Sequence, residues 1–79
     1  MTNREIYDKV FMDCFSVPQG ALTGELEYQC VPAWDSLGHM GMITAVEAAF
    51  GIMMEAKDIS EFDSYTNGIG KLRKYGVEL

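Results

Sequence analysis

The sequence predicts an all-α fold, a small four-helix bundle with a long loop between helices one and two and a short third helix. Apolar residues recur at helical spacing, helix start and stop signals flank them, and no segment alternates as a strand would. A chain of 79 residues makes one small domain, covering residues 1–79.

The first helix is expected from about Asn3 to Phe15. Thr2, with Glu5 three positions later, forms a capping-box pattern at its start. Pro18 and Gly20 then end it. Its core face follows from the apolar spacing and comprises Ile6, Tyr7, Val10, Phe11, Cys14 and Phe15.

Residues 17–35 are expected to form a connection that is unusually long for a small domain. Gly20, Gly24 and Pro32 are spaced along it as turn and loop signals. Such a loop is explained if it crosses the molecule and covers the core with its apolar anchors, which are Leu22, Leu26, Tyr28 and Val31.

The second helix is expected from about Ser36 to Phe50, with Asp35 as its N-cap and Gly51 as its C-cap. The Asp35 carboxylate can accept from the N–H of Leu37 or Gly38. The expected core face comprises Met42, Ile43, Val46, Ala49 and Phe50. The opposite side is small and mildly apolar, where an exposed helix normally carries charges.

Two further helices follow. Ile59 and Phe62 indicate a short third helix over about Ala56 to Phe62. Ser64 can cap a fourth helix, over about Tyr65 to Tyr75, which buries Ile69 and Leu72, carries cations in its last turns and ends at Gly76. Gly68 and Gly70 weaken this helix, each by roughly 1 kcal/mol relative to alanine.

The charge balance restricts the class of partner. Twelve acidic residues against six basic ones give a net charge of −6. This argues against nucleic acid and anionic membranes, because phosphate groups attract lysine and arginine. No apolar run approaches membrane-spanning length, so we expect no membrane insertion.

Cys14 and Cys30 lack metal-ligand spacing, and the N-terminus lacks the apolar stretch of a secretory signal. We therefore expect reduced thiols and a cytoplasmic protein. No nucleophile–base pair, paired carboxylates or glycine-rich phosphate loop is evident. The expectation is a non-catalytic protein without a metal site, most simply a monomer.

The segment Trp34-Asp35-Ser36-Leu37-Gly38-His39-Met40, leading into Ala48-Ala49-Phe50-Gly51-Ile52, resembles an acyl carrier protein of the stand-alone type. That family opens its second helix with Asp-Ser-Leu or Asp-Ser-Met and ends it with apolar and aromatic residues. The resemblance extends over the whole chain, because its length, acidity, expected helix order, long first loop and short third helix also fit.

The resemblance implies that Ser36 receives 4′-phosphopantetheine from coenzyme A, donated by a separate phosphopantetheinyl transferase. The thiol of that arm would carry acyl groups as thioesters between an acyl-loading ligase or synthase and other enzymes. Asp35 would help to hold the transferase's magnesium, in addition to capping the helix. The phosphodiester is anionic, which suits the N-terminus of a helix.

A docking surface for partner enzymes is expected on the less apolar side of the second helix. Its residues are Leu37, Met40, Gly41, Thr44, Glu47 and Ala48. The alternative is that the protein's own loop covers this side. Gly38, Gly41 and Ala48 stand where carriers of the fatty-acid type commonly have acids, which favours a specialised pathway: polyketide, nonribosomal peptide or polysaccharide-modifying.

Two other interpretations remain open. The cargo could be aminoacyl or peptidyl, on a carrier of the same family. The chain could also be a helical interaction module in which Ser36 is only a helix-start residue.

His39 is expected to pack against Trp34, because the two occupy the positions of a hydrophobic staple around the Asp35 cap. A lone histidine without partners is a poor metal ligand set. Methionines cluster around the second helix at Met40, Met42, Met53 and Met54. They either fill a small core or line an adaptable pocket for an acyl chain.

Overall fold

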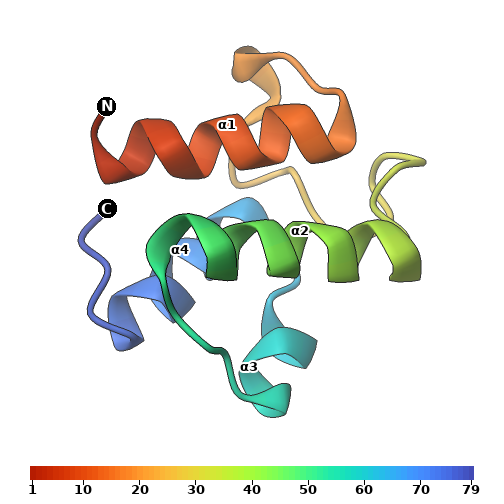
Figure 1. Ribbon diagram of the computed structural model, residues 1–79. Helices are drawn as coiled ribbons and strands as arrows, with labels where there is room; N and C mark the ends of the chain where they lie inside the picture. Colours follow the sequence, from red (N-terminus) through yellow and green to blue (C-terminus); the bar gives the residue numbers. More distant parts are fainter.

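The computed structural model describes residues 1–79, and all of its regular structure is helical (Figure 1). The chain measures 29 × 28 × 20 Å. This confirms the all-α prediction. The elements in order are α1 (Asn3–Phe15), the short 3₁₀ helix η1 (Gln19–Ala21), α2 (Ser36–Phe50), α3 (Ala56–Glu61) and α4 (Tyr65–Lys74).

The helix boundaries agree with the predicted caps. Thr2 and Glu5 form the reciprocal capping box at the start of α1. Asp35 caps α2, and the Ser64 hydroxyl accepts a hydrogen bond from the Asn67 N–H at the start of α4. Gly51 ends α2 in the left-handed conformation, with φ of 63°. The last two helices each end one residue earlier than predicted, because Phe62 and Tyr75 act as their C-caps.

An aromatic cluster forms the centre of the core. Phe15 of α1 stacks on Trp34 with ring centroids 4.7 Å apart and an interplanar angle of 14°. Phe11 contacts the same indole edge-on, with centroids 5.5 Å apart. The Tyr7 hydroxyl donates to the Tyr65 carbonyl at 2.7 Å. The core therefore joins α1, α4 and the end of the connection between α1 and α2.

Gly68 permits one of these close contacts. A Cβ at this position of α4 would collide with the Phe62 ring and the Tyr7 hydroxyl. The predicted weakening of α4 at Gly68 is thus offset by packing that only glycine allows. Gly70 has open space around it and has no such role.

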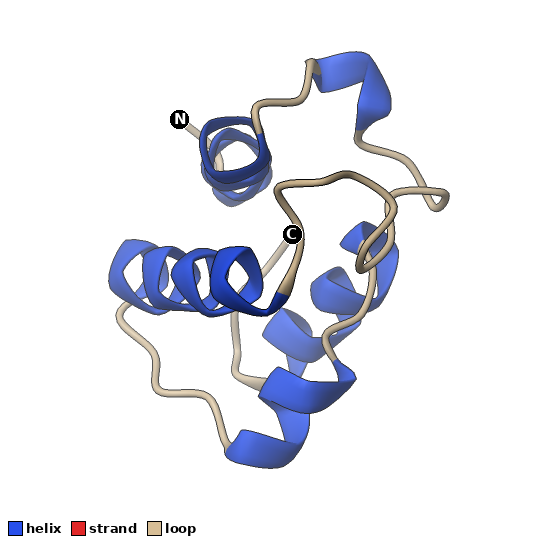
Figure 2. Cartoon of the chain, turned by 90° about the vertical axis from the view of Figure 1, so that its right-hand side faces the viewer, coloured by secondary structure: helices blue, strands red, loops and turns tan.

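The connection between α1 and α2 crosses the molecule, as predicted (Figure 2). It is held against the segment between α3 and α4 by backbone hydrogen bonds. The Tyr65 N–H donates to the Leu26 carbonyl at 2.9 Å, and the Tyr28 N–H donates to the Asp63 carbonyl at 2.8 Å. Leu26 is buried, as predicted for an anchor. Tyr28, also predicted as an anchor, is instead 36% exposed.

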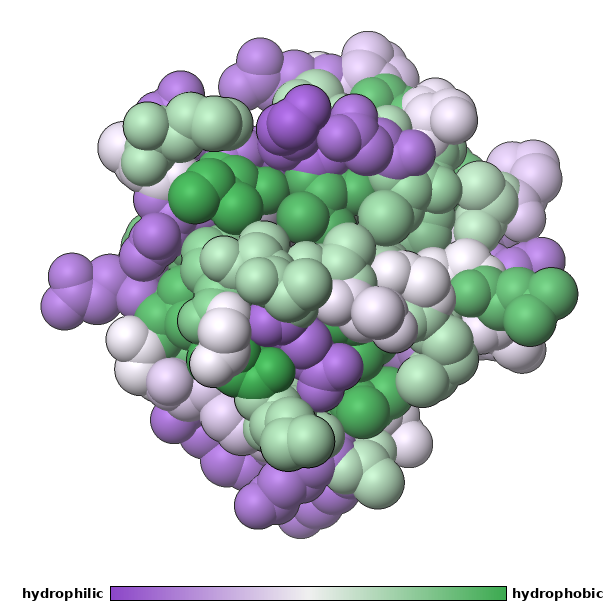
Figure 3. All heavy atoms as spheres, in the orientation of Figure 1, coloured by the Kyte–Doolittle hydropathy of each residue, from purple (hydrophilic) through white to green (hydrophobic).

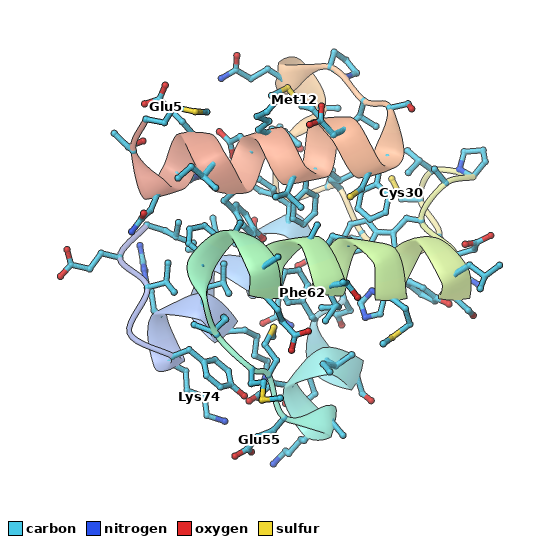
Figure 4. All side chains as sticks on the ribbon, in the orientation of Figure 1. Glu5, Met12, Cys30, Glu55, Phe62 and Lys74 are labelled. Atoms are coloured by element: carbon cyan, nitrogen blue, oxygen red, sulfur yellow. The ribbon has the colours of Figure 1, made fainter.

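Asp58 links α3 to α4. It is the only charged side chain in the buried set, with 1% exposure. Its carboxylate accepts hydrogen bonds from Lys71, Lys74 and the Tyr75 hydroxyl. These donors hold the pKa of the Asp58 carboxyl well below its ordinary value, with the Tyr75 hydrogen bond the largest cause. Lys74 and Glu55 are labelled at this end of the molecule in Figure 4.

The two sides of α2 differ in burial largely as predicted. Met42, Ile43 and Val46 are buried, and Phe50 packs against the core. Ala49, predicted in the core face, is exposed instead. The buried face of α2 is therefore narrower than the five predicted core positions. Hydrophobic residues form a band across the middle of the face seen in Figure 3, over α2 and its seam with α1.

Candidate functional site

Ser36 is the first residue of α2, and its side chain is exposed. Asp35 precedes it in extended conformation, and its carboxylate Oδ1 accepts a hydrogen bond from the Gly38 N–H at 2.9 Å. The first N–H groups of any helix have no intrahelical acceptor. An anion attached to the Ser36 oxygen would therefore lie where backbone donors and the helix dipole favour negative charge.

Gly38 has a steric reason to lack a side chain. A Cβ at this position would collide with the Ala33 carbonyl oxygen of the incoming connection. Gly41, one turn later, has nothing within 4 Å of such a Cβ. The absence of an acid at Gly38 therefore follows from the close approach of the connection to α2.

Trp34 and His39 are in contact, which confirms the predicted pairing. Their rings are nearly parallel, with centroids 6.3 Å apart, and the indole Nε1 donates to His39 Nδ1 at 3.0 Å. The other ring nitrogen, Nε2, lies 2.8 Å from the carbonyl oxygen of Ile59. Since an indole N–H can only donate, Nδ1 must accept and Nε2 must carry the proton. His39 is thereby a neutral bridge between the connection, α2 and α3.

Tyr28 lies directly beside Ser36. Its hydroxyl is 3.1 Å from the Ser36 Oγ, and its ring lies edge-on to His39 with centroids 5.6 Å apart. Sequence reasoning missed this contact, because the apolar pattern of the connection predicted only a core anchor. The sequence has no signal for it, since residues from two separate segments meet there.

An open cleft of about 370 Å³ lies between α2 and the α3 region, next to Ser36. Ile59 and Phe62 supply apolar surface, and Phe62 is labelled near α2 in Figure 4. Ser60 and Asp63 add polar groups. The complete lining is Tyr28, Ser36, His39, Met40, Ile59, Ser60, Phe62 and Asp63. Of the clustered methionines, Met40 lines this cleft, whereas Met42 and Met54 are buried and Met53 is 87% exposed.

The proposed docking residues lie on an uncovered side of α2. Five of them are exposed: Leu37, Met40, Gly41, Thr44 and Ala48. The alternative that the protein's own loop covers this side is therefore wrong. Leu37 is 85% exposed and Met40 is 50% exposed, so this side of α2 presents two large apolar side chains to solvent.

Glu47 is held differently from the other docking residues. It is half-buried, and its carboxylate accepts a hydrogen bond from the Met54 N–H at 2.8 Å. The only acid on α2 thus stabilises the turn that follows the helix.

Neither cysteine forms a disulfide. Cys14 is half-buried, and burial raises the pKa of its thiol. Cys30 is exposed. No three histidine, cysteine, aspartate or glutamate side chains come together in a metal-binding arrangement. None of the helices combines the length and apolar character needed to cross a membrane.

Comparison with protein-family models, curated proteins and solved structures found no match for this chain.

Proposed function

We propose that this chain is a carrier protein of the four-helix-bundle type, which bears acyl groups as thioesters on a 4′-phosphopantetheine arm attached to Ser36. The observation that carries the proposal is the setting of Ser36. It is exposed at the first position of α2, behind an aspartate that caps the helix, in an acidic all-helical chain with a long first connection.

The residues present are suited to this group. Ser36 offers a primary hydroxyl at the surface, and the free N–H groups that begin α2 favour the phosphodiester. In the attachment, the Ser36 oxygen attacks the phosphorus of coenzyme A that bears the pantetheine. An oxygen–phosphorus bond forms, the pyrophosphate bond breaks, adenosine 3′,5′-bisphosphate leaves, and the serine proton passes to a base of the transferase. The bound arm supplies a thiol for thioester formation.

The chain itself would provide attachment and recognition, not catalysis. Asp35 would serve both as the cap of α2 and as a contact for the magnesium of the phosphopantetheinyl transferase. Leu37 and Met40 extend from the same end of α2 and would meet the transferase and the acyl-loading enzymes. One flexible arm then lets a cargo visit several enzymes without dissociating, which raises its effective concentration.

The scarcity of acidic residues on α2 supports a specialised pathway, such as polyketide, nonribosomal peptide or polysaccharide-modifying synthesis. The cargo would be an acyl or aminoacyl group. The helix contains only one acid, Glu47, and one of its carboxylate oxygens accepts from the Met54 N–H. Partner enzymes of this chain would recognise apolar side chains along α2, not a row of acidic ones. We place such a carrier in the cytoplasm, as a monomer.

The test is enzymatic attachment of the arm. The purified chain is incubated with coenzyme A, magnesium and a broad-specificity phosphopantetheinyl transferase, and its intact mass is then measured. We expect a gain of one phosphopantetheine that is lost in Ser36→Ala. Ser60→Ala is the matched control, because Ser60 lines the same cleft and is also exposed.

A mass gain that persists in Ser36→Ala would show that the arm is attached to another residue. No gain with several active transferases would refute the carrier proposal. It would favour a helical interaction module, for which the exposed Leu37 and Met53 provide apolar contact surface.

A further inference from the structure

Tyr28 is held in place from three sides although its side chain is partly exposed. Its N–H donates to the Asp63 carbonyl at 2.8 Å. The next residue, Gln29, has a positive φ of 67°, and its N–H donates to the Trp34 carbonyl at 2.9 Å. The Tyr28 ring also packs edge-on against His39. The two hydrogen bonds therefore fix the backbone at Tyr28, and the contact with His39 places its ring.

The Tyr28 hydroxyl has one hydrogen-bond partner in the protein, the Ser36 Oγ at 3.1 Å. In the unmodified chain either hydroxyl can donate. Once the Ser36 oxygen is esterified it has no proton, so only Tyr28 can donate. The charged phosphoryl oxygens then lie two bonds from that ester oxygen, on the phosphorus that it bears, and their charge makes them much stronger acceptors.

The charges around Ser36 make this donor important. The cleft beside it contains no lysine or arginine, and its one acidic side chain is Asp63. Asp35 adds a second carboxylate next to Ser36. A phosphodiester at this place would lack a cationic side-chain partner among these residues. The neutral hydroxyl of Tyr28 is the donor that the fold already holds against the attachment oxygen.

We infer that Tyr28 is a positioning residue for the arm, and that its hydroxyl donates a hydrogen bond to the phosphodiester on Ser36. This inference rests on the proposed carrier function. The contact would hold the root of the arm at the edge of the cleft between α2 and the α3 region. The arm would then be restrained at its phosphate and mobile beyond it.

The test compares the modified wild-type chain with modified Tyr28→Phe, which keeps the ring and its packing on His39. Phosphorus NMR reports the phosphodiester directly. We expect Tyr28→Phe to shift the phosphorus resonance and to increase the mobility of the first pantetheine carbons. Tyr65→Phe is the matched control, because it removes a hydroxyl that bonds Asp8 and Arg4, outside this site. Its phosphorus resonance should match that of the wild type.

A second measurement needs no variant. In the modified wild-type chain, ring protons of Tyr28 should show nuclear Overhauser contacts with the pantetheine methylene next to the phosphate. An unchanged phosphorus resonance in Tyr28→Phe, together with no such contacts, would overturn the role of Tyr28 while leaving the carrier function intact. Failure of the wild-type chain to accept the arm would overturn both, and the mass measurement identifies that case.

Discussion

The indole nitrogen of Trp34 donates to Nδ1 of His39 across 3.0 Å, and the proton on the opposite ring nitrogen of His39 points to the Ile59 carbonyl. Trp34 is fully buried. One neutral histidine thus satisfies a buried donor of the connection and an acceptor of α3 at the same time. His39 lies one turn into α2, the helix that begins with Ser36. Its two hydrogen bonds therefore hold the start of this helix against the connection and α3.

Removing this bridge should destabilise the fold. His39→Leu leaves the Trp34 N–H buried without a partner, which costs about 1–3 kcal/mol. Urea unfolding of His39→Leu, Trp34→Phe and the double variant forms a double-mutant cycle. We expect a coupling free energy of about 0.5–3 kcal/mol, as found for residues in contact. Strict additivity of the two single variants would contradict the hydrogen bond.

The two glycines at the start of α2 should respond oppositely to alanine. Gly38→Ala places a Cβ against the Ala33 carbonyl and should destabilise by about 1–3 kcal/mol, the usual cost of overpacking. Gly41→Ala has open space and should stabilise by about 0.5–1 kcal/mol, because alanine is the better helix former. Chemical denaturation of both variants checks the pair. Equal effects would show that the connection does not approach α2 this closely.

Two substitutions of Asp35 should distinguish its role as a helix cap from its role in contact with the transferase. Asparagine caps helices about as well as aspartate, so Asp35→Asn should keep the wild-type stability, whereas Asp35→Ala should lose about 0.5–2 kcal/mol. If Asp35 also contacts the transferase's magnesium, both variants should accept the arm more slowly. Unfolding curves and the rate of mass gain give the two answers independently. A wild-type rate in Asp35→Asn would restrict Asp35 to the cap.

Leu37 and Met40 should matter for partners and little for folding. Both are exposed, so Leu37→Ala or Met40→Ala should change the unfolding free energy by no more than about 0.5 kcal/mol. Transfer of the arm, or loading by the partner ligase, should slow down. The readouts are circular dichroism and the transfer rate. Unfolding of either variant would place the residue in the core instead.

Acid should weaken the link between α3 and α4. The folded-state pKa of Asp58 is depressed, so the unfolded chain binds more protons at low pH. Its contribution is fully present above about pH 5 and is lost as the pH falls below the ordinary aspartate pKa, about 3.9, toward the folded value. Thermal unfolding from pH 7 to pH 3 should therefore show a smaller decline in Asp58→Asn than in the wild type. Parallel declines would contradict the role of Asp58.

The elements with strong local signals could be predicted from the sequence. Thr2 with Glu5, Asp35 and Ser64 placed the starts of α1, α2 and α4, because a capping side chain bonds to backbone only three residues away. The Trp34–His39 pairing was also predictable, since both positions are set by the cap between them. The ends of α3 and α4 were less certain, because a last turn has no comparable side-chain signal.

Other features depended on segments that are distant in the sequence. Tyr28 followed an apolar pattern, yet the pairing of its backbone with Asp63 directs its hydroxyl to Ser36. In the sequence, Gly38 was notable only because carriers of the fatty-acid type commonly have an acid there. The structure shows that the Ala33 carbonyl approaches too closely for any side chain at this position. No local pattern indicated a role for Asp58, because its partners Lys71 and Lys74 lie on the next helix, α4.

The sequence by itself determined where the helices begin and that a serine stands first in α2, because those properties depend on hydrogen bonds between near neighbours. Only the tertiary structure decided what surrounds that serine. The cleft, the Tyr28 hydroxyl and the uncovered side of α2 all result from how the connection folds back on the segments after α2, and local residue preferences do not specify that packing.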